Sequence, residues 1–470
     1  MYDPVLLKNS ERKVHMIHKY KLAGYNIVID VNSGAIHAVD DLTYDILDNI
    51  EPPFAPSCPE NVLEKLQKFH RKEDIWTCYN EVTELYREKL LFSDEEVPEP
   101  EKTIPPLRAL CLNISHDCNL RCDYCFAAGG SFGGDRMLMS PDTAERAVDF
   151  LIEKSGNIKN LEIYFFGGEP LINFKTMEAT VRYARSKERE CGKSFRFSVT
   201  TNGTLLDDEK TEFINRDMSG VVLSVDGRRE TNDSMRVYAC GGGTYDSIIP
   251  KYRKLLEGRG NSGYYIRGTF TKKNLDFSED VFSLLDAGFK HISIEPVMKG
   301  VAAEYAVTEL ELPRVFREYD ILLQRMIELE KSGQGFDFFH FDIDTDGMDC
   351  LRKKTRGCGC GNEYAAVTPS GDIYPCHQFI GDSEMCLGNI NSGTLNDDIR
   401  KIFASADINT KKECRECWAK YFCSGGCNAC NYHSCGDVRC THKMSCLLMK
   451  KRIECAIVLK VFRAERQGKI

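Results

Sequence analysis

The stretch Cys118-Asn-Leu-Arg-Cys122-Asp-Tyr-Cys125 places three cysteines on one short loop, directly after an apolar run at Ala109–Ile114. Three thiolates can ligate three irons of a 4Fe–4S cube and leave the fourth iron without a protein ligand. Because an iron with an open position can bind an outside molecule, this spacing predicts a catalytic cluster. A structural zinc site with His116 as its fourth ligand is one alternative, and loose thiols are the other.

Strand-like and helix-like segments alternate from this loop onward. The candidate strands are Ala109–Ile114, Leu161–Phe166, Phe195–Thr200, Val221–Val225, Tyr264–Phe270 and His291–Glu295. The candidate helices are Pro141–Lys154, Phe174–Cys191, Asp207–Asn215, Tyr245–Leu256, Ser278–Ala287 and Leu310–Lys331. Six such units predict an α/β fold in which a parallel sheet with right-handed crossovers curls into a partial (β/α)6 barrel. Its ligand site is expected at the C-terminal ends of the strands.

Composition narrows the class of protein. The chain has 470 residues, which is too many for one ordinary core, so two or three domains are expected. A net charge of -9 argues against binding of nucleic acid, which needs a basic face. No apolar run is long enough to span a membrane, and Met1–Lys19 lacks the apolar stretch of a secretory signal. We therefore expect a cytoplasmic protein.

Five segments follow from the pattern along the chain. Residues 1–92 form a small separate unit, in which His15–Ile29 favours strand and Asn32-Ser33-Gly34 marks a hairpin before Ala35–Val39. Asp40 or Asp41 is expected to cap a helix through Leu47. Residues 93–106 are acidic and proline-rich, as in a linker. The barrel is expected over 107–333, a cysteine-rich domain over 345–455, and a C-terminal helix or tail over 456–470.

The cysteines are concentrated toward the C-terminal end. Of 22 in the chain, 13 lie between Cys350 and Cys446, many at close spacings such as Cys414-x2-Cys417. In a reducing compartment such a run indicates metal binding rather than disulfides. Because this segment has little apolar material, we expect metal ligation to order it.

The strand ends and the cysteine loop together resemble the radical S-adenosylmethionine superfamily. In that family the cofactor's methionine group chelates the open iron of a cluster held here by Cys118, Cys122 and Cys125, and its cleavage yields a 5'-deoxyadenosyl radical. The resemblance implies cofactor-binding roles for eight further residues. They are Tyr124, Gly167, Gly168, Glu169, Ser224, Asp226, Arg236 and Val297. Arg236 is expected on the methionine carboxylate, and Tyr124 and Val297 near adenine.

The cysteine-rich segment resembles the SPASM domain, which carries two auxiliary 4Fe–4S clusters, making three in all. The resemblance assigns two sets of ligands. The outer set is Cys414, Cys417, Cys423 and Cys446, and the inner set is Cys358, Cys376 and Cys427. The inner cluster is expected to keep an open iron, with Cys360 as a possible fourth ligand. Cys430, Cys435 and Cys440 are interpreted as loop thiols.

The N-terminal unit resembles the winged-helix peptide-recognition element of peptide-maturing enzymes, which binds a leader peptide as an added strand. The whole chain is then similar to the thioether-forming maturases of SCIFF precursors, short peptides rich in cysteine. That resemblance implies a crosslink from a cysteine sulfur to a carbon of another residue, expected to be threonine. The open inner iron would hold the substrate thiolate and accept an electron, and flavodoxin or ferredoxin is the expected electron donor. The alternative for the N-terminal unit is a dimerisation or packing role.

Two other functions remain open at this level. Anaerobic sulfatase maturases form formylglycine and place an aspartate base directly after the cysteine equivalent to Cys376, where this chain has His377. A histidine can also act as a base, so His377 is a candidate catalytic residue. A non-catalytic iron–sulfur electron carrier or scaffold is the other alternative, although it has no use for Gly168, Ser224 and Arg236 together.

Overall fold

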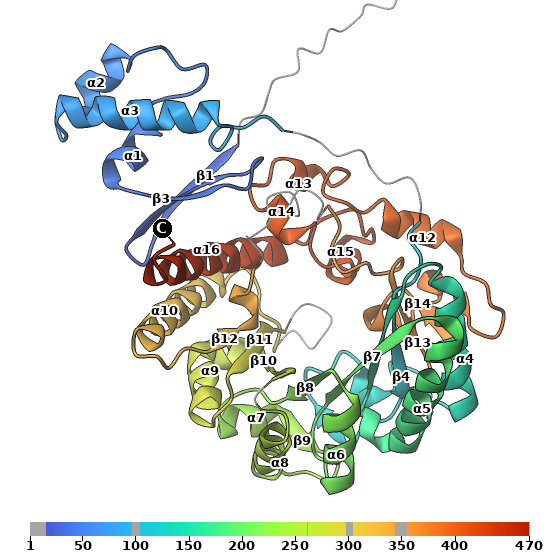
Figure 1. Ribbon diagram of the computed structural model, residues 1–470. Helices are drawn as coiled ribbons and strands as arrows, with labels where there is room; N and C mark the ends of the chain where they lie inside the picture. Colours follow the sequence, from blue (N-terminus) through green and yellow to red (C-terminus); the bar gives the residue numbers. More distant parts are fainter. Residues whose placement is uncertain (1–15, 96–103, 261, 298–303, 344–354, 470) are drawn as a thin grey trace, which may run out of the picture.

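The computed structural model describes residues 16–95, 104–260, 262–297, 304–343 and 355–469 (Figure 1). Most of the predicted linker, residues 96–103, lies outside this described part, and so do the first ten residues of the cysteine-rich domain predicted from 345. Within the described part, no helix is both long and apolar enough for a membrane span.

The predicted barrel is present. Its six parallel strands are β4 (Ala109–Ser115), β6 (Asn160–Gly167), β7 (Ser194–Thr201), β8 (Gly220–Ser224), β10 (Tyr264–Phe270) and β11 (His291–Pro296). The helices that follow are α4 (Pro141–Lys154), α5 (Phe174–Cys191), α6 (Asp208–Asp217), α7 (Arg229–Met235), α8 (Tyr245–Glu257), α9 (Phe277–Asp286) and α10 (Leu312–Lys331). Figure 1 shows the strands curled into an open arc with helices on its outer side. Two short strands, β5 (Leu120–Cys122) and β9 (Arg236–Tyr238), form a separate antiparallel pair.

Side chains alternate along the barrel strands between two environments. In β6, Leu161, Ile163 and Phe165 are fully buried and belong to the main core that also contains residues of α4 and α5. The intervening Glu162 and Phe166 are half-buried. Because successive residues of a strand point to opposite faces, these intervening positions face the barrel interior. The interior is therefore lined by partly exposed side chains that are available to a ligand.

The cysteine-rich domain extends the barrel sheet, which was not predicted. A hairpin of β13 (Tyr364–Val367) and β14 (Asp372–Tyr374), followed by β15 (Gly388–Asn389), lies beyond β4, and β12 (Asp337–Phe338) lies beyond β11. β13 pairs in parallel with β4, with Tyr364 opposite Ala109. The remaining helices are α12 (Asp397–Ala404), α13 (Lys412–Arg415), α14 (Lys420–Cys423), α15 (Asn428–Cys435) and α16 (Lys443–Arg466). The predicted boundary between residues 455 and 456 falls inside α16.

The N-terminal unit has its own core and a three-stranded antiparallel sheet. Its elements are β1 (Ile17–Leu22), β2 (Tyr25–Asp30), β3 (Ile36–Val39), α1 (Asp41–Ile46), α2 (Glu60–Leu66) and α3 (Lys72–Arg87). Asp40 caps α1 by accepting a bond of 2.7 Å from the Thr43 N–H, as predicted. The segment predicted as one strand up to Ile29 is instead two, because Ala23 and Gly24 adopt positive φ angles and form a turn.

This unit packs against α16 and the cysteine-rich domain (Figure 1). The His18 ring stacks on Trp418 with centroids 3.8 Å apart, and its Nε2 lies 3.0 Å from a carboxylate oxygen of Glu454. The Tyr20 hydroxyl donates to the Glu454 carbonyl at 2.9 Å. All three contacts come from β1, so this strand of the small sheet faces the rest of the molecule.

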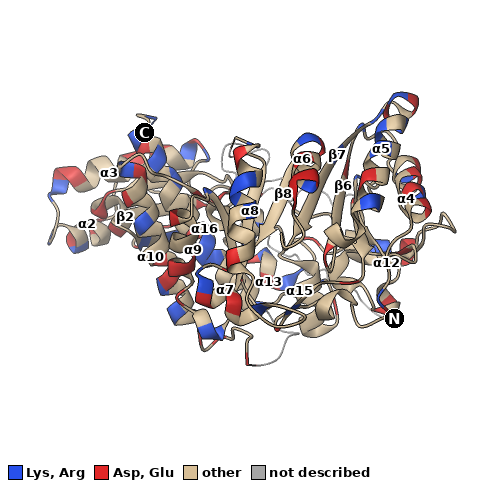
Figure 2. Ribbon diagram, turned by 90° about the horizontal axis from the view of Figure 1, so that it is seen from below, with Lys and Arg blue, Asp and Glu red and all other residues tan. Residues whose placement is uncertain are grey.

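Charges of both signs are interspersed over the helices in the view of Figure 2. In this view the described helices form no continuous basic face.

Candidate active site

The first cysteine loop leaves β4 at the C-terminal edge of the barrel, and its Cys122 pairs with Arg236 across β5 and β9. The Cys118 sulfur accepts bonds from the Leu120 N–H at 3.4 Å and the Asn202 side-chain amide at 3.7 Å. Burial raises the pKa of Cys118 to about 11 and that of Cys122 to about 12, and Cys125 adds to both. A group that binds these sulfurs as thiolates must therefore displace protons.

The donor set fits a cluster better than a single metal ion. Within the described residues, no three His, Cys, Asp or Glu side chains are gathered closely enough to hold one ion. The other two thiols of this loop, Cys118 and Cys125, are nevertheless close enough to act on the pKa of Cys122. His116, the fourth ligand in the alternative zinc site, is buried and packs against Phe132 with the ring centroids 4.9 Å apart. Soft thiolates on one loop are the donors that iron–sulfur clusters use.

Two glycines of the second strand end pack directly against the base of the loop. A Cβ on Gly168 would lie 2.3 Å from the Asp117 carbonyl oxygen and 2.7 Å from Gly130. A Cβ on Gly167 would lie 2.3 Å from the Ser115 oxygen. The resemblance explains these glycines by approach to the cofactor, whereas the contacts that forbid a side chain in this structure are contacts with the chain itself.

Gly168→Ala is therefore expected to push the first cysteine loop out of place. Both close neighbours are backbone atoms, so relief requires movement of the loop, at a cost of about 1–3 kcal/mol. We expect a lower free energy of unfolding and loss of iron from this loop, measured by denaturant titration and iron analysis. Gly134→Ala is the matched control, since its added Cβ would meet only the Ser131 oxygen, at 3.7 Å. Equal behaviour of the two variants would contradict the prediction.

A buried polar network joins three predicted cofactor residues. The Asp226 carboxylate is fully buried; it accepts a bond of 3.0 Å from Arg236 Nε and one of 2.5 Å from the Tyr124 hydroxyl. Burial acts to lower the pKa of Arg236, but Asp226, Tyr124 and Cys122 together outweigh it and keep that pKa well above its usual value. Tyr124 also packs in one apolar cluster with Val297. Residues far apart in the sequence thus meet beside Cys122.

The other predicted cofactor residues are placed less directly. Ser224 ends β8, and its carbonyl accepts the Tyr252 hydroxyl at 2.9 Å. The Glu169 carboxylate is fully buried and accepts three bonds, from the Leu171 and Asn202 N–H groups and the Thr201 hydroxyl. Burial raises its pKa to about 7. In this structure Glu169 ties the second strand end to the third.

Sequence reasoning missed Asn202 as part of this site. The side-chain amide of Asn202 donates both to the Cys118 sulfur and, at 3.0 Å, to Asn119 Oδ1. The Asn119 amide in turn donates to the Thr204 hydroxyl at 2.7 Å. Asn202 directly follows β7, the third barrel strand. Its place at a strand end was the available signal, because polar residues there face the ligand site of such sheets.

The four cysteines predicted as the outer set converge. Cys417, Cys423 and Cys446 all lie close enough to act on the pKa of Cys414, which burial raises to about 12. Cys446 and Cys417 act in the same way on the pKa of Cys423. These sulfurs come from α13, the loop after it, α14 and the start of α16. Four convergent thiols complete the protein ligand set of a cubic cluster.

The predicted inner set also converges, and two further cysteines lie within it. A hydrogen bond from Cys360 lowers the pKa of Cys358 to about 7, and Cys360 also bonds to Cys376. A hydrogen bond from Cys430 lowers the pKa of Cys427 to about 6. Cys427 in turn acts on Cys358. Cys360 and Cys430 are therefore both positioned as candidate fourth ligands.

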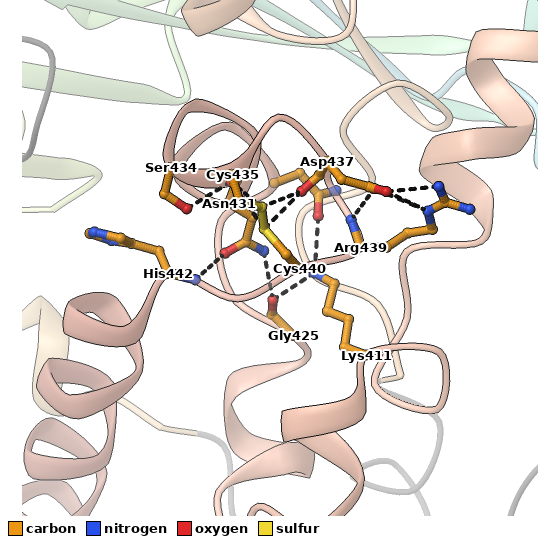
Figure 3. Close-up of a disulfide and its surroundings, with 10 residues drawn as sticks. Lys411, Gly425, Asn431, Ser434, Cys435, Asp437, Arg439, Cys440 and His442 are labelled. Carbon is orange, nitrogen blue, oxygen red and sulfur yellow. Dashed lines mark hydrogen bonds and ion pairs between the residues drawn. A yellow bond between two sulfur atoms is a disulfide. The ribbon is translucent and has the colours of Figure 1, made fainter.

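The interpretation of all three extra cysteines as loop thiols is wrong for two of them. Cys435 and Cys440 form a disulfide at the end of α15 (Figure 3). Asn431 lies beside it; its side chain donates to the Gly425 carbonyl at 3.2 Å and accepts the His442 N–H at 3.0 Å. The general expectation that cysteines in this segment bind metal overlooked a pair separated by only five positions.

His377 lies between the first loop and the inner set. Its ring is 4.7 Å from that of Phe166 on β6 and 5.6 Å from that of Phe126, directly after Cys125. Burial, with a smaller contribution from Arg267, lowers its pKa to about 4, so the ring is neutral near pH 7. The unprotonated imidazole has a nitrogen that can accept a proton, and its lowered pKa makes it a weaker base than an ordinary histidine.

Comparison with known proteins matches two parts of the chain. Residues 112–273 match the radical SAM superfamily, and residues 358–431 match the iron-sulfur cluster-binding SPASM domain. The chain is 31% identical over 288 residues to the uncharacterized protein MJ0907 of Methanocaldococcus jannaschii, which covers 61% of this chain and 89% of that one. It is 23% identical over 384 residues to the radical SAM cyclopropyl synthase TigE of Paramaledivibacter caminithermalis, covering 74% of each.

Solved structures with the same fold differ in how much of the chain they cover. The enzyme anSMEcpe with bound AdoMet has a TM-score of 0.63 at 21% identity and covers 77% of this chain and 96% of its own. Streptococcus suis SuiB bound to its precursor peptide SuiA has a TM-score of 0.53 at 16% identity and covers 92% and 98%. At these identities the likeness concerns the fold alone.

Proposed function

The chain belongs to the radical SAM superfamily and carries a SPASM domain, and from this membership we propose that it crosslinks a cysteine-rich precursor peptide through a thioether. The cofactor set of this proposal is S-adenosylmethionine and three 4Fe–4S clusters. One cluster would be held by the first cysteine loop, and the other two by the inner and outer sets. The sulfur donor is a peptide cysteine, and the acceptor carbon belongs to another residue of the same peptide, for which threonine is our expectation.

The observation that carries the proposal is the position of His377. It follows Cys376 of the inner set, and its ring packs near Phe126 of the first loop. Cys376 of the inner set and the first cysteine loop therefore lie on either side of His377. A peptide there can present a carbon to one site and a cysteine sulfur to the other, which is the arrangement that a carbon–sulfur bond requires.

The chain's own residues have distinct tasks in this mechanism. When bound, the cofactor supplies the radical that removes a hydrogen atom from the peptide carbon. Asp226 fixes Arg236 and Tyr124, so that the Arg236 guanidinium can hold the cofactor's carboxylate. The neutral His377 ring takes the proton of the substrate thiol. Overall the peptide would lose one hydrogen atom, one proton and one electron as the bond forms, and a cluster bound by the inner set would accept that electron.

The barrel interior holds polar groups suited to an extended peptide. Arg267 and Glu295 form an ion pair of 2.5 Å, and both side chains are more than one third exposed. Glu295 also lies 3.8 Å from His340 Nε2. A charged donor and acceptor exposed side by side can bind the carbonyl and N–H groups of a peptide backbone.

The leader peptide would bind to the N-terminal unit along β3. β1 and β3 are the two outer strands of the small sheet, and each pairs only with β2 among the described strands. β1 contacts Trp418 and Glu454, whereas Ala38 of β3 is exposed. A strand with an unpaired edge is a template for an added strand. Structural likeness to peptide-bound SuiB over 92% of the chain supports a peptide partner.

The test is incubation of anaerobically reconstituted protein with S-adenosylmethionine, a reductant and a precursor peptide that carries leader and core. We expect 5'-deoxyadenosine and a peptide lighter by two hydrogens per crosslink, with tandem mass spectra locating the bond. Matched control peptides replace the core cysteines with serine, or lack the leader, and both should stay unmodified. Cofactor cleavage without loss of hydrogen would refute the proposal. Loss of sulfur from a cysteine would indicate formylglycine formation instead.

A further inference from the structure

Lys411 is a lysine with no exposed surface, which is rare because burial of an ammonium group is costly. Its Nζ donates to the Gly425 carbonyl at 2.8 Å (Figure 3). It also donates to Asn428 Oδ1 at 3.4 Å. Both partners are neutral oxygens. Two hydrogen bonds to neutral oxygens compensate only part of the hydration free energy that an ammonium ion loses when it leaves water.

The position of this ammonium group relates it to both auxiliary ligand sets. Burial lowers the pKa of Lys411, whereas Cys414, Cys423 and Cys446 of the outer set and Cys427 of the inner set all act to raise it. Gly425, the nearer hydrogen-bond partner, lies in the chain between Cys423 and Cys427. The cation is therefore held by the segment that joins one predicted cluster to the other.

The local backbone is built around the ammonium group. Gly425 has a φ of +85°, and a Cβ there would lie only 3.3 Å from Lys411 Nζ. The Asn431 side chain donates to the same Gly425 carbonyl at 3.2 Å, which fixes its direction. The Asp437 carboxylate, whose pKa Lys411 helps to lower, is already engaged by Arg439 at 2.7 Å and is partly exposed. The site lacks a dedicated carboxylate partner among the described residues, and an anionic cluster would supply the missing charge.

We propose that Lys411 is the buried counter-ion of the auxiliary clusters and raises their reduction potential. This inference rests on the proposed function, because it requires clusters on the two cysteine sets. A cube ligated by thiolates is an anion, and reduction makes it more negative. A fixed cation nearby stabilises the reduced form more than the oxidised form, so the potential rises. Full burial makes this effect weakly sensitive to salt.

The experiment uses a parent protein in which Cys118, Cys122 and Cys125 are replaced by alanine. Only the auxiliary clusters then contribute to the measured reduction potentials. Lys411→Gln and Lys411→Met remove the charge, and Lys411→Arg keeps it. Lys412→Gln is the matched control, because it removes the same charge from an exposed neighbour. Iron content and EPR-monitored redox titrations are recorded for each variant after anaerobic reconstitution. We expect the Lys411→Gln and Lys411→Met variants to lower the midpoint potential of at least one auxiliary cluster. The Lys411→Arg and Lys412→Gln variants should have the midpoint potentials of the parent protein.

The outcomes separate this inference from the proposed function. Full iron content with an unchanged potential in Lys411→Gln or Lys411→Met overturns the counter-ion role. Loss of iron with an unchanged potential in the clusters that remain also overturns it, since that is the signature of a purely structural lysine. A parent protein that binds no auxiliary iron overturns both proposals. A shifted potential in an enzyme that never modifies peptide supports Lys411 and refutes the proposed reaction.

Discussion

Replacing Cys118, Cys122 and Cys125 together with alanine is expected to abolish cleavage of S-adenosylmethionine while leaving the two auxiliary ligand sets intact. About four of about twelve irons should be lost and about eight retained, because each 4Fe–4S cluster holds four irons. Peptide modification should disappear together with 5'-deoxyadenosine formation. Iron analysis and chromatography of the cleavage product provide the two measurements.

The control replaces three other cysteines, none of which is predicted to bind a cluster. Cys58, Cys191 and Cys240 lie apart from the three sets and are half-buried or exposed, so their joint replacement with alanine should leave iron content and activity unchanged. A triple loop variant that still cleaves the cofactor would refute the assignment of the first cluster. So would one that loses nearly all its iron.

Asp226→Ala should be the most damaging single substitution outside the cysteines. The variant leaves the Arg236 guanidinium buried without its partner, and breaking a buried ion pair in this way costs about 3–5 kcal/mol. It also frees Arg236 and Tyr124, so cofactor affinity should fall on the order of a hundredfold. Denaturant unfolding and calorimetric titration of S-adenosylmethionine into reconstituted protein test the two effects.

A surface pair of the same type provides the control. Arg229 and Asp246 form an ion pair in which both side chains are more than half exposed. Asp246→Ala should change the free energy of unfolding by no more than about 0.5–1 kcal/mol and leave cofactor binding intact. Equal losses of stability and of cofactor affinity in the two variants would contradict the predicted role of the Asp226 network.

The barrel could be predicted because its signals are local. Its strands are short apolar runs between polar stretches, and its helices begin at recognisable caps, such as Ser140 before Pro141. The hairpin of β13 and β14 gave no such signal. These strands have four and three residues, and β13 pairs with β4, whose partner residues lie about 255 positions earlier in the chain. Nothing local indicates a pairing over that distance.

The cysteine sets could be predicted from the family resemblance, which transfers positions without geometry. The structure brings the members of each set together. Beside the inner set lie Cys360, already named as a possible fourth ligand, and Cys430, interpreted from the sequence as a loop thiol. The resemblance did not indicate Lys411, because a lysine after a polar run gives no sign that it will be fully buried. Glu169 illustrates the opposite case. It was assigned to the cofactor, yet its carboxylate is occupied by three donors of the chain.

The parallel pairing of β4 with β13 has a consequence for synthesis of the chain. While a ribosome makes residues 116 to 363, the edge of β4 that will receive β13 has no partner, and exposed strand edges invite pairing with other chains. The first cysteine loop follows this strand and is complete long before the hairpin emerges. The nascent chain passes through a stage in which the thiols of the first loop are present and the inner set does not yet exist.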